Sequence, residues 1–522
     1  MLLVVGLVMH YAWGAFASPQ RRDGNSGHTT IDFGGQWLMG RMLVEGLGQH
    51  LYHRNYQREV LREAYPQEDE PPDSERVDEE KGKHDADNFM GWFMGKDTAP
   101  DGAPDQPAVG GPLYPPIHAL LMYPLANLRP ALAYRVIQGL IIVMAFVAGW
   151  GIRQLAHGRI WWTVAVPALM LFPAYTHGLN LGQNSAFMLA ILVWGWLLIT
   201  RGRQVAGGIV WGLLAFKPVW AAAFFLVPVL TGRWRVCLAM IITGSALAVA
   251  TLPVVGFHSW LEWLWIGKQA SNLYGVDENW VFLSRDLLTI PKRWLVDFHA
   301  PDTERFSWPA TILGWGLVGI IFALTVLLAT YRRDRTRVVE GPGAAFLLLG
   351  AFFSCYHFMY YDSLLAALPV ALFFSDPARF ARPRLIAILP LGTASPDKSL
   401  EEFYQPRLPC GSQETVPLPT SHRGIFVLSS LSLSLLAFLL ISETLLPTLG
   451  IAVSVSMPTH NGLAVPMPLK YSTGLAGTPL STFCLIIFWF WAGWTWLRSP
   501  LNESQRKKAE VRQDSRTSAD CQ

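Results

Sequence analysis

Three polar groups interrupt the long apolar stretches of this chain, and each contains side chains that could do chemistry. The first is Asp32, which follows the first apolar segment and precedes a predicted helix. A carboxylate at a membrane boundary beside Phe33 and Trp37 is partly removed from water, which raises its proton affinity and suits it to act as a general base. Asp before a helix also commonly serves as an N-cap. Taken alone, Asp32 fits the cap better.

The second group centres on Lys217, which lies in the apolar run 213–220 directly before Pro218. A lysine at membrane depth is costly and usually faces a cavity or a partner charge. In such a place it could bind a phosphate as a point charge. The alternative is that the apolar stem of the side chain extends and carries the ammonium group to the membrane–water interface.

The third group combines an imidazole, a carboxylate and three phenols, with His357, Tyr361 and Asp362 as its candidates. These side chains could position a sugar hydroxyl or a phosphate. An aromatic belt at the membrane interface with a helix-capping Asp explains them equally well. The amides of Gln183-Asn184 leave the same choice open, because they could bind sugar hydroxyls or simply form a turn.

The composition shows which kind of protein must position these residues. The chain has 522 residues, of which 51% are hydrophobic and only 15% charged, whereas soluble proteins carry about 25% charged residues. Stretches 136–152, 236–255 and 309–331 approach the length needed to cross a bilayer. The net charge of +3 and the scattered basic residues exclude a nucleic-acid surface. Five cysteines without paired spacing predict neither a disulfide framework nor a metal site.

Short basic clusters predict the topology, because Lys and Arg beside membrane spans accumulate on the cytoplasmic side. If all the clusters lie inside, the polar residues midway between them must lie on the outer side, where a site could form. This arrangement predicts an all-α polytopic membrane protein with about twelve spans and both termini in the cytoplasm. The clusters are 153–159, 201–204, 233–235, 332–337 and 379–384.

The predicted organisation has six parts. Pro218 and the polar group at 356–362 should break two spans into pairs of short helices. The outer loop should hold two short apolar helices at the membrane surface and an acidic, solvated insertion at 63–105, with 14 acidic and 4 basic residues. The parts are a first span at 1–18, an outer loop at 19–129, a membrane core at 130–375, a cytoplasmic linker at 376–423, a pair of spans at 424–497 and a cytoplasmic tail at 498–522.

At these residues the chain resembles glycosyltransferase family 87, whose members are multi-spanning enzymes of the GT-C class. The matching pieces are Asp32-Phe33, Leu51-Tyr52, Tyr114-Pro115-Pro116, Leu181 to Asn184, Gly212 to Pro218, Asn279 to Leu288 and Tyr361 to Leu365. The resemblance implies a GT-C-like bundle with a large first outer loop. It makes Asp32 the catalytic base and places Lys217 and His357 in the active cavity, where Arg285 could also bind the donor phosphate. Tyr114, Gln183, Asn184, Tyr361 and Asp362 are then the candidates for binding substrate.

The reaction that this resemblance implies is an inverting transfer of a sugar, usually mannose, from a polyprenyl-phosphate carrier. The acceptor would be a lipid or glycan at the outer face of a bacterial inner membrane, and the active site would face the periplasm or exterior. No cofactor is implied, and the cations can replace a divalent metal. The alternative is a transporter, since broken helices also form transport sites. Polar groups near one face, and the lack of a visible repeat, favour the enzyme.

Overall fold

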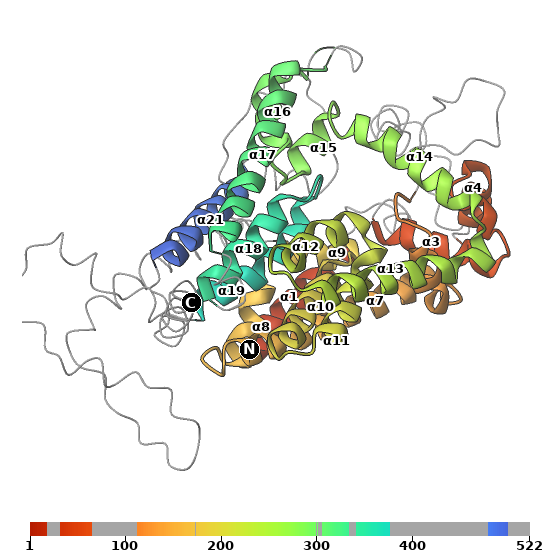
Figure 1. The fold of residues 1–522 in the computed structure, drawn as a ribbon. Helices are drawn as coiled ribbons and strands as arrows, with labels where there is room; N and C mark the ends of the chain where they lie inside the picture. Colours follow the sequence, from red (N-terminus) through yellow and green to blue (C-terminus); the bar gives the residue numbers. More distant parts are fainter. Residues whose placement is uncertain are drawn as a thin grey trace, which may run out of the picture. The chain divides into compact units, whose positions relative to one another are not determined.

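The computed structural model describes residues 1–17, 32–64, 112–172, 174–298, 300, 305–332, 341–375 and 479–498. Within these ranges every regular element is a helix (Figure 1), and one isolated bridge joins Ser284 to Met359. The acidic insertion falls almost wholly outside the described residues. The same holds for the predicted cytoplasmic linker and for the predicted span that begins at residue 424.

Three of the described helices are long and apolar enough to cross a membrane: α7 (Pro130–Leu155), α13 (Trp234–Val255) and α17 (Trp308–Tyr331). Large apolar side chains such as Ile241 and Ile312 are exposed on them, as expected of surfaces that face lipid. These helices identify a membrane protein. The predicted count of about twelve spans is not confirmed by the described residues. The shorter apolar helices are 185–200, 204–216, 218–230, 341–353, 360–374 and 481–497.

The first predicted helix break is present. Helix α11 (Gln204–Gly212) continues into η4 (Leu213–Phe216), and α12 (Pro218–Leu230) begins one residue later. Lys217 between them is extended, with φ −130° and ψ 79°, because Pro disfavours the helical conformation in the residue before it. Glycines bring α11 close to α13, since a Cβ at Gly212 would lie 2.5 Å from the Thr243 side chain.

The second predicted break is present as well. Helix α18 (Gly341–Phe353) ends before an irregular turn, and η5 (Tyr360–Ala366) leads into α19 (Ala367–Phe374). Helix α21 (Leu480–Arg498) packs against α18, with Trp489 stacked on Phe346 at 5.2 Å between ring centroids. The C-terminal apolar stretch thus joins the same core.

Within the predicted membrane core, the apolar stretch 160–176 was expected to form one continuous span, but the structure divides it. Helix α8 (Trp162–Met170) has nine residues, and α9 (Tyr175–Leu181) follows a turn in which Ala174 has φ 80°. Gly182, with φ 62°, separates α9 from α10 (Ser185–Thr200). The left-handed turn at Ala174 divides the apolar stretch, and neither piece alone has the length of a membrane span.

The N-terminal part begins with α1 (Leu2–Ala17) and continues with α3 (Asp32–Val44). On α3 the side chains of Trp37 and Met39 point to nearly opposite sides of the helix and are both buried. Neighbouring elements therefore cover α3 on more than one face. They are η1 (Gly48–His50), α4 (Arg54–Ala64), α6 (Ile117–Met122), η3 (Tyr123–Leu125) and α7.

Three shorter helices follow α13: α14 (His258–Leu273), α15 (Glu278–Leu283) and α16 (Thr289–Leu295). Helix α14 contacts the N-terminal part, where Ser259 donates to the backbone carbonyls of Gly48 and Gln49, both at 3.3 Å. Helix α16 contacts α17. The loop between α15 and α16 carries Arg285 and Asp286, two buried charged residues.

Candidate active site

A buried ion pair joins the two helix breaks. The Lys217 Nζ donates to both carboxylate oxygens of Asp362, at 2.7 and 2.8 Å. The Lys217 side chain is 17% exposed and that of Asp362 is 1% exposed. The lysine therefore points to a partner charge rather than to the membrane surface. Such a pair offsets the cost of burying each charge only when the geometry is good, as it is here.

The pair has further contacts on its Asp362 side. The Met359 backbone N–H donates to the second carboxylate oxygen at 3.4 Å. The ring of Tyr361 lies 5.2 Å from the Lys217 ammonium, within range of a cation–π contact. Asp362 was predicted to bind substrate, and the structure places its carboxylate against Lys217. An ammonium has three donors, and two hydrogen bonds of Lys217 are seen among the described residues, both to Asp362.

A second charged pair lies between the loop at 286 and the turn before η5. The His357 Nδ1 is 2.9 Å from a carboxylate oxygen of Asp286, and the other oxygen accepts from the Thr289 backbone N–H at 2.9 Å. The Tyr274 ring stacks on the imidazole at 4.2 Å. The Asp286 carboxylate can accept a hydrogen bond from Nδ1 and so orients the ring, with Nε2 on its other side. That Nε2 is buried without a hydrogen-bond partner among the described residues.

Backbone contacts fix these two pairs relative to each other. The Arg285 backbone N–H donates to the Phe358 carbonyl at 3.0 Å, next to the bridge between Ser284 and Met359. Cys355 interacts electrostatically with Asp362, Lys217 and Asp286, which shows that both pairs lie near one another.

The Arg285 side chain, predicted to bind the donor phosphate, contacts backbone carbonyls of its own segment. Its Nη1 donates to the backbone carbonyls of Phe282 and Ser284, at 2.8 and 3.1 Å. Arg293 also donates to the Ser284 carbonyl. These contacts stabilise the loop that carries Asp286. Arg285 therefore helps to hold Asp286 in position next to His357.

A third polar group connects α3 to this region. The Asn184 Nδ2 lies 2.8 Å from the Gln36 Oε1 and 2.9 Å from the His118 Nε2. All three side chains are buried. The Gln183 amide donates to the Tyr114 hydroxyl at 2.9 Å. The predicted residues Tyr114, Gln183 and Asn184 therefore lie together.

Two histidines in this region are neutral. Burial, with the nearby Lys217 charge second, lowers the pKa of His118 to about 3. Burial, with Arg285 second, lowers the pKa of His177 to about 4. A neutral imidazole agrees with the hydrogen bond from Asn184, because the His118 Nε2 must then accept. The site thus contains neutral histidines beside its two cations.

Asp32 is the first residue of α3, one helical turn before Gln36. Its neighbour Phe33 lies against Gly182, where an added Cβ would be 2.7 Å from the Phe33 Cβ. This close approach places the start of α3 next to the turn that carries Gln183 and Asn184. The catalytic role of Asp32 stays a prediction.

Sequence reasoning missed four residues of this region, namely Gln36, His118, Tyr274 and Asp286. Asp286 could have been found, because it lies next to Arg285 in a segment already singled out. Gln36, His118 and Tyr274 carry no such signal. Among the residues that the structure describes, no group of three His, Cys, Asp or Glu side chains could hold a metal ion.

One family model matches this chain, that of glycosyltransferase family 87, over residues 113–372. The chain belongs to glycosyltransferase family 87. No curated protein and no solved structure matches it. The matched range contains both charged pairs, whereas Asp32 and Gln36 precede it. Membership of family 87 identifies a glycosyltransferase with a sugar donor and an acceptor, and so decides against the transporter.

Proposed function

We propose that this family 87 enzyme transfers a sugar, mannose by the resemblance, from a polyprenyl-phosphate carrier to a hydroxyl of a lipid or glycan. We place the reaction at the outer face of the membrane, in a GT-C-like bundle. The observation that carries the proposal is the buried Lys217–Asp362 pair at two helix breaks, close to the His357–Asp286 pair. Burying four ionisable groups in an apolar bundle is costly, so such groups mark functional sites.

The proposed reaction is a single displacement. The Asp32 carboxylate accepts the proton of the acceptor hydroxyl, whose oxygen attacks the anomeric carbon of the donor. The bond between that carbon and the phosphate oxygen breaks, and the polyprenyl phosphate leaves with the electron pair. One displacement at one carbon inverts its configuration. What supports this role is that α3 begins with Asp32 and that its next residue, Phe33, packs against Gly182, which precedes Gln183 and Asn184.

The leaving phosphate needs stabilisation of its charge more than it needs a proton, because it is already a weak base. Two donors are available for it. The remaining Lys217 N–H can reach an oxygen without breaking the pair with Asp362, and His357 can donate from Nε2 when it is protonated. The Asp286 carboxylate against Nδ1 orients the ring for this contact.

The test is a transfer assay with purified protein, labelled polyprenyl-phosphate mannose and lipids from bacterial inner membranes. We expect Asp32→Asn to abolish turnover while the protein unfolds at the same temperature as the wild type. The matched control is Glu45→Gln, one residue after the same helix, since Glu45 pairs with Arg41 at a partly exposed position. The control should keep nearly full activity.

Two outcomes would overturn parts of this proposal. Full turnover by Asp32→Asn, together with loss of turnover by His357→Asn, would make His357 the base instead. A wild-type enzyme that transfers sugar from a nucleotide sugar but not from the polyprenyl-phosphate donor would refute the donor class.

A further inference from the structure

Three buried polar side chains form a hydrogen-bonded bridge between α3 and the first helix break, and the proposed reaction does not use them. Gln36 lies on α3, Asn184 directly precedes α10 and His118 lies on α6. Gln36 and His118 are 0% exposed and Asn184 is 6% exposed. Burying a polar group costs free energy unless it is hydrogen-bonded. The three groups of this polar bridge therefore depend on one another.

Asn184 is the centre of the polar bridge. Its Nδ2 donates to the Gln36 Oε1 at 2.8 Å and to the His118 Nε2 at 2.9 Å. An amide nitrogen carries two N–H groups, and these two acceptors take both. An Asn directly before a helix commonly caps it, but within the described structure Asn184 makes no capping bond to α10. Its amide nitrogen therefore joins two other elements and has no N–H left for a sugar hydroxyl.

Gln36 fixes the first turn of α3. Its Nε2 lies 3.3 Å from the Gly182 carbonyl and 3.4 Å from the Tyr114 hydroxyl, while its Oε1 accepts from Asn184. Positions 32 and 36 share one face of α3, because four residues make about one helical turn. The contacts of Gln36 therefore set the rotation of α3, and with it the place of Asp32.

His118 connects the polar bridge to Lys217. Its ring lies edge-on to that of Phe216, with 5.4 Å between the centroids, and Phe216 directly precedes Lys217. Burial, and after it the Lys217 charge, lowers the pKa of His118 to about 3. The imidazole is therefore neutral. It accepts the Asn184 N–H without bringing another charge to the ion pair of Lys217 and Asp362.

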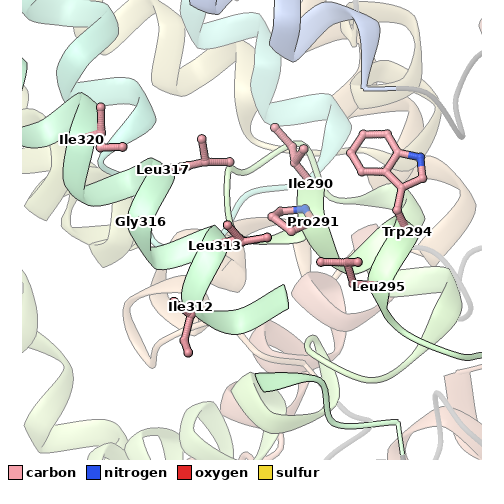
Figure 2. Close-up of a pocket in the computed structure, with 9 residues that line it drawn as sticks. All are labelled: Ile290, Pro291, Trp294, Leu295, Ile312, Leu313, Gly316, Leu317 and Ile320. Atoms are coloured by element: carbon pink, nitrogen blue, oxygen red, sulfur yellow. The ribbon is translucent and has the colours of Figure 1, made fainter. Parts of the chain in front are cut away.

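Apolar packing alone joins other helices of this bundle. In Figure 2, Leu313 of α17 is directed toward Pro291 of α16, and the nine labelled residues include no amide and no charged side chain. Apolar side chains could likewise hold α3 against α6 and α10, because they often replace buried polar groups without loss of stability. A fully bonded polar network adds a unique arrangement of its members. The polar bridge therefore supplies fixed distances as well as stability.

We propose that Gln36, Asn184 and His118 are positioning residues, which hold Asp32 at a fixed distance from Lys217. This inference rests on the proposed function, because Asp32 is the base of that reaction. It also changes the role expected of Asn184, which then acts through Asp32 and not on the substrate. A displacement of about 1 Å can lower a rate about 100-fold. Breaking the polar bridge should therefore lower kcat and leave donor binding intact.

A matched pair of variants at position 118 tests this proposal. His118→Gln keeps an acceptor for the Asn184 N–H, whereas His118→Leu removes it. We expect His118→Leu to lower kcat at least about tenfold and to keep the KM for the donor within about twofold of the wild type. His118→Gln should restore most of kcat.

Gln57→Met is the control for the loss of a buried amide elsewhere. Gln57 is 3% exposed, and its Nε2 donates to the Leu51 carbonyl at 2.7 Å. Its replacement should lower the unfolding temperature, because that carbonyl loses its partner, and should leave kcat nearly unchanged. A loss of kcat in Gln57→Met as large as in His118→Leu would overturn the proposal, since general destabilisation would then explain both.

Hydrogen exchange of the α3 backbone in detergent gives a measurement that does not depend on turnover. His118→Leu should increase exchange in the first turn of α3, whereas His118→Gln and Gln57→Met should not. This inference alone fails if His118→Leu keeps the kcat of the wild type while Asp32→Asn is inactive. It also fails if His118→Gln loses as much kcat as His118→Leu, or if KM rises while kcat is unchanged. Full turnover by Asp32→Asn, together with increased exchange in His118→Leu, would refute the proposed function but support the hold of the polar bridge on α3.

Discussion

Two charged clusters in this enzyme are built in contrasting ways. In the first, Lys217 and Asp362 are both largely enclosed, and the ammonium bonds to both carboxylate oxygens. In the second, Glu262 of α14 accepts from His53 at 2.7 Å and is 3.1 Å from His258, whose side chain is 77% exposed. The exposed His258 of the second cluster can exchange a lost contact for water, whereas the enclosed Asp362 of the first cannot. We therefore expect that the Lys217–Asp362 pair must stay intact, whereas the Glu262 cluster serves to join two segments of the chain.

Removing one partner of the enclosed pair should have the largest effect. Lys217→Met leaves the Asp362 carboxylate buried without its cation, which costs about 3–5 kcal/mol and should abolish transfer. The double variant Lys217→Met with Asp362→Leu should recover most of the stability but none of the activity. Thermal unfolding in detergent and the transfer assay measure the two quantities. An active double variant would show that the pair only holds the helices together.

The next largest effect should be that of a lower pH, which we expect to act on the region around Lys217. His118, beside Lys217, has a pKa of about 3 in the folded protein, against about 6.5 in an unfolded chain. Below pH 6.5 the imidazole of His118 binds a proton in the unfolded chain but not in the folded protein. The folded protein therefore loses stability as the pH falls. By pH 5 the loss is about 2 kcal/mol for this residue.

His118→Asn should remove this part of the acid sensitivity. Unfolding temperatures at pH 7.5 and pH 5 should therefore differ less in His118→Asn than in the wild type. Equal differences in the two proteins would mean that His118 is accessible to protons in the folded state.

The smallest effect should come from the exposed member of the second cluster. His258→Ala should cost less than about 1 kcal/mol and leave turnover within twofold of the wild type. His53→Ala should cost more, because its side chain is mostly enclosed. Both values come from thermal unfolding at low and high salt. A loss with His258→Ala as large as that with Lys217→Met would erase the distinction between the two clusters.

The sequence predicted those parts of the fold that depend on the local conformation of the backbone. Pro218 marked the first break, because its ring excludes a helical residue before it. The division of 160–176 was missed, although Pro173 in that stretch offered the same signal. Apolar composition alone showed a membrane protein, but it could not show that protein covers α3 on nearly every side.

The contacts of the site were harder to predict than its members. Lys217 and Asp362 were each singled out, but they are 145 residues apart, and no periodicity relates them. The position of Asp286 opposite His357 likewise depends on packing between distant segments. Burial decides which polar groups meet, and burial is a property of the folded chain.

One contact of α21 has a consequence for how the enzyme is made. The Thr482 hydroxyl donates to the Arg285 carbonyl at 2.8 Å, across 197 residues of chain. At a synthesis rate of roughly 5–20 residues per second, about 10–40 s separate the two residues on the ribosome. During that interval the loop with Asp286 lacks its last hydrogen bond. The loop that carries Asp286 therefore reaches its final contacts only after α21 has been synthesised and has packed.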